Sequence, residues 1–298
     1  MRVIVHGGAG ENPTDPEARQ ESLDDAVAAA SGAETPLGAV RTAIRRLESD
    51  PLFNAGVGSA VQADGHIRTD AGLMASDRSI GAACGMPGVE HAIDVAATVR
   101  SETPHVLVSG VHAVDLADAY GTETGVDLWT DRTRERWNDL EERPPADPRK
   151  QARWVRERFG ESDGRDHDTV GAVATDGERS VAATSTGGRW FALAGRVGDV
   201  PQVGSGFYCT EAGGASATGA GEDIARQTLS RRAVDFLEDG HDAQTAAETA
   251  IEAFGDLAAG VAGLIVLTPD GDTGSAYDSD SMETAVAGEI DGPSADVL

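Results

Sequence analysis

One threonine of this chain stands where it could become a nucleophile. Thr169 begins the run TVGAVAT directly after the charged segment ESDGRDHD. A threonine hydroxyl needs an adjacent base before it attacks a carbonyl, and an N-terminal threonine carries that base as its own α-amine. The ordinary pKa of such an amine is about 7.7 to 8.0, so part of it is unprotonated near neutral pH. Cleavage of the Asp168–Thr169 bond would create the amine; without cleavage, the run is typical of a buried core strand.

The segments around Thr169 predict a β-hairpin. TVGAVAT and RSVAATST are rich in small and β-branched residues, and an Asp-Gly pair at 176–177 lies between them. Two such runs around an Asp-Gly pair are a strong short-range hairpin signal. Because the two strands run antiparallel, Thr186 near the end of the second is expected within reach of Thr169. VAGLIVL and GSAYDS, around the Asp-Gly pair at 270–271, predict a second hairpin.

The remaining segments alternate between helical and strand-like patterns. Apolar residues at three- and four-residue spacing predict helices over 16–33, 37–48, 89–102, 109–121, 220–238 and 242–260. Strands are predicted over 2–6, within the glycine-rich stretch 53–74, and over 283–288. From 131 to 168 the chain is dense in charge and contains three prolines, so a partly helical linker with an exposed end is expected. An α+β fold, with helices on both outer faces of two stacked antiparallel sheets, satisfies this order.

The charge balance is strongly acidic. The chain has 51 acidic and 24 basic residues, a formal net charge of −27, and Lys150 as its only lysine. Self-repulsion of this size strains a compact fold at low ionic strength, whereas molar salt shortens the screening length to about 3 Å. We therefore expect a protein adapted to a salt-rich cytoplasm, with an ordinary acidic enzyme as the alternative. The balance also argues against nucleic acid or an anionic membrane as partner, because each needs a basic patch.

Several classes of protein are excluded by length and motif content. The 298 residues can bury a substantial core, and the longest apolar runs fall short of the roughly 18 to 20 residues that span a bilayer. The N-terminus lacks the apolar core of a secretory signal, so a cytoplasmic location is expected. Cys84 and Cys209 are too few for a disulfide scaffold or a zinc cluster and are expected to be buried. Phosphate-loop, zinc-protease and nucleophile-elbow motifs are missing from the sequence, and no cofactor is predicted.

Six motifs, in order along the chain, carry a family resemblance. They are HGGAG (6–10), PLFNAGVGS (51–59), DTVGAVA (168–174), TSTGG (184–188), GRVGD (195–199) and ATGAGED (217–223). Together they resemble the isoaspartyl peptidase / plant-type L-asparaginase family, whose members are hydrolases with an N-terminal threonine nucleophile. The resemblance covers most of the chain apart from the linker and the C-terminal tail. The combination is far more specific than any single motif.

The resemblance implies a fold and a maturation step. The expected fold is the four-layer αββα sandwich of the N-terminal nucleophile hydrolases. The expected precursor is one hydrolase domain, residues 1–298, that cuts itself between Asp168 and Thr169. Its pieces would be 1–168, the alpha subunit ending in the charged linker at about 131–168, and 169–298, the beta subunit. Two cleaved protomers would form a homodimer, and the substrates would be L-asparagine and isoaspartyl dipeptides.

The resemblance also implies roles for individual residues. Thr169 would be the nucleophile of both reactions, and Thr186 would hydrogen-bond it. Arg196 would bind the substrate α-carboxylate, for which a guanidinium fork is suited, and Asp199 would bind the α-amine. A hydroxyl and a backbone N–H, from Thr218 and its neighbour, would form the oxyanion hole. The implied substrate-binding set is Arg196, Val197, Gly198, Asp199, Thr218, Gly219, Ala220 and Gly221, and Thr218 and Gly219 belong to the catalytic set as well.

Two further motifs are expected to support the site without doing chemistry. HGGAG would shape it, with His6 as a buried core histidine and not a base. LESDPLFNAGVG resembles the loop that holds a sodium ion through backbone carbonyls in some relatives. Here the carbonyls would come from residues near Glu48, Phe53, Ala55 and Val57, and such an ion would be structural. No metal is predicted for the reaction itself.

Other functions stay open at this point. HDT at the predicted cut resembles glycosylasparaginase and threonine aspartase, whereas HGGAG, FNAG and TSTGG favour the isoaspartyl branch. RWFALAG replaces the usual polar lead into GRVGD, so substrate preference also stays open. The alternative of another class is a non-catalytic protein that captures amino acids with Arg196 and Asp199. A local surface ion pair of these two residues is the less favoured interpretation.

Overall fold

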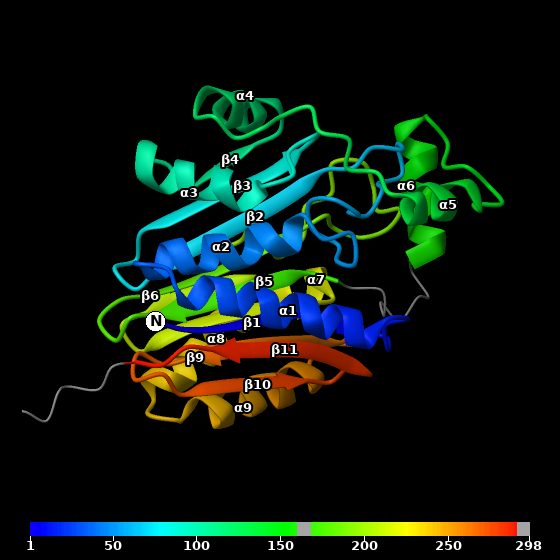
Figure 1. Ribbon diagram of the computed structural model, residues 1–298. Coiled ribbons are helices and arrows are strands. Elements are labelled where there is room, and N and C mark those ends of the chain that lie inside the picture. Colours follow the sequence, from blue (N-terminus) through cyan, green and yellow to red (C-terminus); the bar gives the residue numbers. More distant parts are fainter. Residues whose placement is uncertain (160–167, 291–298) are drawn as a thin grey trace, which may run out of the picture.

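The structure, a computed structural model, describes residues 1–159 and 168–290 as a mixed α/β fold, and in that part the strands form two sheets (Figure 1). The larger sheet has the order β11 (Ser281–Ala287), β1 (Arg2–Gly10), β5 (Val170–Thr175), β6 (Ser180–Thr186), β2 (Thr69–Ala75), β3 (Ile80–Met86) and β4 (Leu107–Ser109). The smaller sheet has the order β10 (Thr273–Tyr277), β9 (Ala262–Leu267), β8 (Gly213–Gly219) and β7 (Phe207–Thr210).

Strands from before and after Thr169 are interleaved in the larger sheet. β1 lies between β11 and β5, and β2 pairs with β6. The sequence predicted antiparallel sheets, and one pair corrects this: β3 and β4 run parallel, joined through α3 (Ala92–Glu102). Parallel neighbours require such a crossover, because a tight turn can only connect antiparallel strands.

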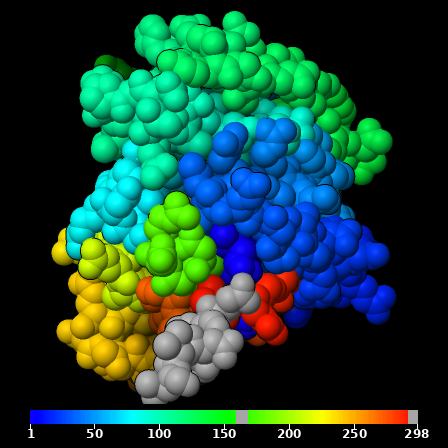
Figure 2. Space-filling model, turned by 60° about the vertical axis from the view of Figure 1, so that its left-hand side comes forward, coloured from blue at the N-terminus to red at the C-terminus, as the bar shows by residue number. Residues whose placement is uncertain are grey.

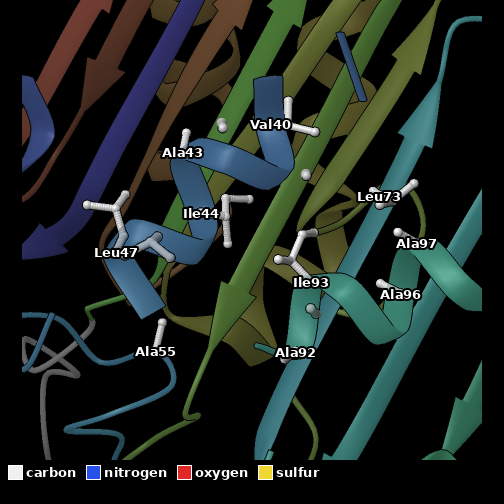
Figure 3. Close-up of a cluster of buried hydrophobic side chains, with 14 of the residues drawn as sticks. Val40, Ala43, Ile44, Leu47, Ala55, Leu73, Ala92, Ile93, Ala96 and Ala97 are labelled. Carbon is white, nitrogen blue, oxygen red and sulfur yellow. The ribbon is translucent and has the colours of Figure 1, made fainter. Parts of the chain in front are cut away.

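Helices of the first half cover one face of the larger sheet. They are α1 (Pro16–Ser31), α2 (Pro36–Glu48), α3, and α4 (Val111–Ala119). Figure 3 shows apolar side chains of α2 and α3 gathered between the helices and the strands, among them Val40, Ile44 and Ile93. Many members of this cluster are alanines, which allow helix and sheet to lie close together.

The smaller sheet has its own helical cover. Its helices are α8 (Leu229–Glu238) and α9 (Ala243–Gly255), and a second cluster of buried apolar residues fills the space between them and β8 and β9. A third cluster joins the two sheets and includes Val173, Phe207 and Ile265. In the space-filling view, the first half of the chain forms the upper part of the molecule and the last part forms the lower (Figure 2).

Both predicted hairpins are confirmed. β5 and β6 pair through the turn at 176–177, and β9 and β10 pair through the turn at 270–271. The predicted strand at the N-terminus is confirmed and extends to Gly10, so HGGAG is part of β1. A register shift between His6 and Ala9 and a φ of 117° at Gly8 interrupt the pairing there. Such a bulge re-aims backbone groups at the end of a strand.

The strand predicted within the glycine-rich stretch 53–74 is confirmed only at the end of that stretch. The stretch forms turns and one isolated bridge between Val61 and Ile67, and regular strand begins only at Thr69. The strands β3, β4, β7 and β8 were not predicted. In β3 and β8 the reason is that the runs IGAACGM and GGASATG are poor in β-branched residues. The predicted helix 220–238 is broken at Thr228, whose φ is 50°, into α7 (Gly221–Gln227) and α8.

The linker before Thr169 contains two helices, α5 (Asp131–Asn138) and α6 (Pro148–Phe159). The end of the linker that was predicted to be exposed, ESDGRDHD, lies outside the described residues except for its last residue, Asp168. α5 and α6 pack on a cluster around the buried Trp190 and Phe191. The φ of Phe191 is 57°. The other members include Trp129, Trp137 and Trp154, so all four tryptophans of the chain meet here. The aromatic replacement in RWFALAG is therefore a packing surface for the linker helices.

Two smaller expectations concern cysteines and membranes. Cys84 and Cys209 are buried and form no disulfide, as predicted. Among the helices that the structure describes, none combines the length and apolar character needed to cross a bilayer.

Candidate active site

Thr169 and Thr186 meet at the same end of the β5–β6 hairpin. Val170 faces Ser185 in the register, so the next step outward brings the two threonines opposite each other. The hydroxyl of Thr169 donates a hydrogen bond to Oγ1 of Thr186 at 3.1 Å, and both side chains are buried. Thr169 lies directly before β5, and its β-branched side chain has few χ1 choices. Together with the hydrogen bond, this restrains the direction of its hydroxyl.

A loop from the first half of the chain holds the end of β6. The backbone N–H of Gly187 donates to the carbonyl of Asn54 at 2.8 Å, and Asn54 Nδ2 donates to the carbonyl of Gly188 at 2.6 Å. The N–H of Gly188 donates to Thr186 Oγ1 at 3.1 Å. A Cβ at Gly187 would lie 2.2 Å from that of Ser59, so the two segments approach too closely for any larger residue. The motifs FNAG and TSTGG therefore form one unit.

Arg196 and Asp199 form a second group with residues of α7. Arg196 donates from Nε and Nη2 to the two carboxylate oxygens of Glu222 at 2.9 and 2.8 Å. A Cβ at Gly221 would lie 2.6 Å from Asp199 Oδ1 and 2.8 Å from Arg196 Nη2, so the missing side chain keeps this corner open. Gly198 packs against the guanidinium in the same way, whereas Val197 is 37% exposed.

The charges in this group perturb one another. Burial raises the pKa of Asp199 to about 6, although the positive charge of Arg196 opposes the rise. Burial likewise acts to raise the pKa of Glu222, but its hydrogen bonds to Arg196 outweigh burial and bring the value down to about 2. Among the described residues, Oδ2 of Asp199 is buried without a hydrogen-bond partner. An orphaned carboxylate oxygen is costly and is suited to receive a cation.

Asp70 connects the two groups and was missed at the sequence level. It is buried on β2, it stands opposite Thr186 in the register, and its Oδ1 accepts a hydrogen bond from the N–H of Gly85 at 2.7 Å. Burial raises its pKa to about 7, with Arg196 lowering it and Asp199 raising it further. An acidic residue inside the apolar run TDAGLMA was the available signal.

Thr218 and Gly219 end β8, and Ala220 precedes α7. Thr218 is fully buried, and its Oγ1 accepts a hydrogen bond from the N–H of Ala9 at 3.3 Å, which ties it to HGGAG. Gly219 has a φ of 131°, and a Cβ there would meet the carbonyl of Val261 at 2.3 Å. Only glycine fits this position. Within the described residues, no direct hydrogen bond joins Thr218 to Thr169 or to Arg196.

A buried polar network lies beneath these residues. His6 Nε2 is 3.0 Å from Ser216 Oγ, which is 2.7 Å from Thr184 Oγ1, and Thr184 donates to the carbonyl of Gly206 at 2.7 Å. Burial lowers the pKa of His6 to about 3, although the backbone of Thr169 acts in the opposite direction. A neutral histidine in such a network supports the site, and the prediction of a buried core histidine is confirmed.

Asp168, directly before the hairpin, faces Arg19 of α1. The two side chains form an ion pair with Nη2 and Oδ1 3.1 Å apart, and Arg19 is buried. Nothing in the local sequence around Arg19 marks it as part of the site, because the two residues lie 149 positions apart.

Backbone segments pack closely at the predicted sodium loop, whose carbonyls were expected near Glu48, Phe53, Ala55 and Val57. The position of a Cβ at Gly56 would lie 2.1 Å from the carbonyl oxygen of Glu48, and that at Gly58 would lie 3.3 Å from the carbonyl oxygen of Phe53. Hard monovalent and divalent cations prefer oxygen ligands of this kind. The Glu48 carbonyl also accepts a hydrogen bond from Val57 N–H at 2.8 Å. Among the described residues, no cluster of three or more histidine, cysteine or acidic side chains could hold a metal ion.

Comparison with known proteins places the chain in a family. The family model described as asparaginase matches residues 1–293. A plant-type L-asparaginase of Pyrococcus abyssi is 38% identical over 292 residues, which cover 96% of this chain and 95% of the relative. The isoaspartyl peptidase/L-asparaginases of Macaca fascicularis and Homo sapiens are each 33% identical over 297 residues, which cover 96% of this chain and 92% of each relative. The chain belongs to the asparaginase family.

Proposed function

We propose that this protein is a self-cleaving isoaspartyl peptidase and L-asparaginase, with the four-layer αββα arrangement of the N-terminal nucleophile hydrolases. The observation that carries the proposal is the buried hydroxyl pair of Thr169 and Thr186, 3.1 Å apart where β5 begins. The packing of helices on the outside of two contacting sheets supports the layer arrangement. Family membership supports the reaction, since curated relatives carry both activities in their names.

Self-cleavage would begin at the Thr169 hydroxyl. Its oxygen attacks the carbonyl carbon of Asp168, the peptide C–N bond breaks, and the nitrogen takes up the hydroxyl proton. The product is an ester between Asp168 and the threonine side chain, with a free α-amine. One water molecule then hydrolyses the ester and leaves a carboxylate on residue 168 and a hydroxyl on residue 169. Thr186 would hold the attacking hydroxyl in place throughout, because positioning of reacting groups is a large part of such catalysis.

Hydrolysis of substrate would repeat this chemistry with the new amine as base. The amine takes the proton of its own hydroxyl while the oxygen attacks the side-chain carbonyl of asparagine or the β-aspartyl bond of an isoaspartyl residue. The C–N bond of the substrate breaks, and the proton passes to the leaving ammonia or amino acid. Water then hydrolyses the aspartyl ester and releases aspartate. Two rounds of attack thus share one nucleophile.

The facing of the two sheets supports Thr218 as part of the oxyanion hole. A Cβ at Gly214 of β8 would meet Val173 of β5 at 2.9 Å, and a Cβ at Gly171 of β5 would meet Ser216 of β8 at 2.0 Å. Each step of two residues keeps the same face of a strand. By the same alternation, the next step would turn Thr218 toward Thr169. Its hydroxyl and the N–H of the following glycine would stabilise the oxyanion, a contribution typically worth about 10²–10³ in rate per donor.

Substrate recognition would fall to the Arg196 group. Glu222 occupies the Nε and Nη2 side of the guanidinium, and Nη1 makes no hydrogen bond within the described residues. The Nη1 end would bind the substrate α-carboxylate, and the unpaired Oδ2 of Asp199 would bind the α-ammonium. Together these residues would select a free amino-acid backbone.

Three further features belong to the proposal. A sodium ion held by carbonyls near Glu48 and Phe53 would brace the loop that supports Thr186.

The two free cysteines suit a reducing compartment such as the cytoplasm. A homodimer of cleaved protomers would account for the exposed apolar side chains of Leu107 on the edge strand β4 and of Val111 at the start of α4, which are 44% and 64% exposed.

Mass spectrometry under denaturing conditions tests the proposal. We expect pieces 1–168 and 169–298 from the wild-type protein and one uncut, inactive chain from Thr169→Ala. Thr169→Ser keeps the hydroxyl and the amine and is expected to cut. A fully active wild-type enzyme that remains a single chain would overturn the proposal.

Substrate turnover decides the branch of the family. Asparagine, β-Asp-Leu and glycosyl-asparagine are compared on the cut enzyme. Turnover of the first two supports the proposal, whereas exclusive turnover of glycosyl-asparagine would reject it in favour of glycosylasparaginase. Binding of aspartate by an uncut and inert protein would instead indicate an amino-acid-binding module.

A further inference from the structure

Arg19 is a buried cation whose orientation is fixed by neutral groups. Its side chain comes from α1 and is 4% exposed. Nη1 donates to the carbonyl of Leu52 at 2.7 Å, and Nη2 donates to the carbonyl of Gly7 at 2.7 Å. The guanidinium also lies 4.6 Å from the ring centroid of Phe53. These contacts set its plane and direction, but none of them neutralises its charge, and a buried charge without a counter-ion is strongly unfavourable.

The carboxylate of Asp168 supplies the counter-ion. Oδ1 lies 3.1 Å from Nη2 and Oδ2 lies 3.4 Å from Nη1 of Arg19, so both oxygens face the end of the guanidinium. Glu283 forms a second ion pair with Arg19, with its Oε2 3.6 Å from Nε, but this contact lies outside hydrogen-bond geometry. The two-point contact with Asp168 restricts rotation of that side chain more than a single bond does.

The peptide bond between Asp168 and Thr169 is thereby held from both sides. The side chain before the bond is fixed by Arg19 on α1, and the side chain after it is fixed by Thr186 on β6. A peptide between two anchored residues has little torsional freedom, so its carbonyl carbon stays near the threonine hydroxyl. We propose that Arg19 is a positioning residue for self-cleavage, and that it acts through the carboxylate of Asp168. This inference rests on the proposed cleavage at the same bond.

Space beside this ion pair suits the second half of the reaction. A cavity of about 460 Å³ borders Arg19 and Asp168 and is also lined by Gly10, Leu52 and Arg132. Water that hydrolyses the ester needs access to the carbonyl of residue 168. After hydrolysis, the new terminal carboxylate of Asp168 can leave or turn within this cavity, because no covalent bond ties it to Thr169.

A double-mutant cycle tests the inference. Wild type, Arg19→Gln, Asp168→Asn and the double variant are made by cell-free synthesis, and conversion to two pieces is followed on denaturing gels after a chase. We expect each single variant to cut about tenfold more slowly, since a charge-assisted hydrogen bond is lost. The double variant should be no slower than the slower single variant, because both changes remove the same contact. Arg19→Lys keeps the charge without the fork and should cut at an intermediate rate.

Glu283→Gln is the matched control, because it neutralises the other anion near Arg19 and leaves the Asp168 contact intact. It should cut at the wild-type rate. Cleavage of Asp168→Asn at the wild-type rate, or multiplicative slowing in the double variant, would overturn the inference.

Folding and the underlying proposal are separated by two further measurements. Melting temperatures of the same variants in the Thr169→Ala background show which precursors are folded. If Arg19→Gln does not fold, the inference is tested by comparing Asp168→Asn with the charge-conserving Asp168→Glu. We expect Asp168→Asn to cut slowly and Asp168→Glu to cut at nearly the wild-type rate. A wild-type chain that is never cut refutes the proposed function itself, whereas normal cutting with no effect of Arg19 refutes only this inference.

Discussion

Arg196 and Glu222 form a side-on ion pair in which Nε and Nη2 of the arginine contact both carboxylate oxygens, at 2.9 and 2.8 Å. The arginine side chain is 15% exposed and the glutamate side chain is 47% exposed. A guanidinium has two edges that can each make a forked hydrogen-bond contact. The pair with Glu222 occupies one edge and leaves the other edge for a ligand. We therefore expect Glu222 to orient Arg196 without taking the place of the substrate carboxylate.

The first prediction concerns Glu222→Gln. A neutral amide accepts weaker hydrogen bonds, so Arg196 should be less well oriented, and KM for asparagine should rise by about tenfold with little change in kcat. Steady-state kinetics on the cut enzyme measure both constants. Asp223→Asn, at the neighbouring position, removes a similar charge without touching Arg196 and serves as the control. A fall in KM would show instead that Glu222 competes with the substrate.

The second prediction concerns Thr186→Val, which has nearly the same shape but no hydroxyl. Loss of the 3.1 Å contact with Thr169 should slow both self-cleavage and kcat by about tenfold. Thr186→Ser retains the hydroxyl and should stay close to wild type in both. Rates of cutting on gels and turnover of the cut enzyme are the two readouts. Equal rates for the valine and serine variants would remove Thr186 from the mechanism.

The third prediction is a pH dependence of substrate binding. Burial raises the pKa of Asp199 to about 6, so its carboxylate is charged above that pH and becomes neutral below it. The attraction for the substrate ammonium is lost as the pH falls, and KM should rise by up to about tenfold per pH unit below about pH 6. Asp199→Asn should have a high KM that hardly varies over this range. Wild-type KM that stays flat down to pH 5 would contradict the assignment.

Asp70 provides the control for this titration. Its pKa, raised by burial to about 7, reflects interaction with both Arg196 and Asp199. Asp70→Asn removes a neighbouring negative charge, so the midpoint of the KM profile should shift to lower pH while the profile remains. If the profile vanished in this variant, Asp70 and not Asp199 would be the group that titrates.

The fourth prediction is that cutting does not separate the two pieces. β1 of the first piece is hydrogen-bonded between β5 and β11 of the second, and β2 pairs with β6. Separation would break three ladders and expose the apolar residues between the sheets. On a sizing column without denaturant, the cut enzyme should elute with uncut Thr169→Ala, and both pieces should appear only on a denaturing gel. Independent elution of 169–298 would contradict this.

The fifth prediction is stabilisation by salt. A net charge of −27 produces long-range repulsion, and raising KCl from about 0.1 to about 1 M shortens the screening length from about 10 to about 3 Å. The melting temperature should rise over this range. Sucrose, which stabilises by exclusion without screening, separates charge effects from general ones. An unchanged or lower melting temperature in KCl would favour the ordinary acidic enzyme considered above.

The sequence by itself determined the local parts of the site. Thr169 and Thr186 could be brought together in advance because an Asp-Gly turn fixes the register of the hairpin between them. The glycine at 219 was likewise placed from its motif, and its φ of 131° explains why no side chain is accepted there. Family motifs supplied the roles of these residues, since spacing alone gives no chemistry.

Only the tertiary structure decided the contacts that lie between distant segments. Arg19 contacts Asp168 although the two residues are 149 positions apart in the sequence. Asp70, on β2 beside β6, interacts electrostatically with Arg196 and Asp199. No local pattern records such contacts, because they depend on which helix covers which strand. The strands β3 and β8 were hidden for a related reason: their small residues have weak strand preference, and burial between layers makes them strands.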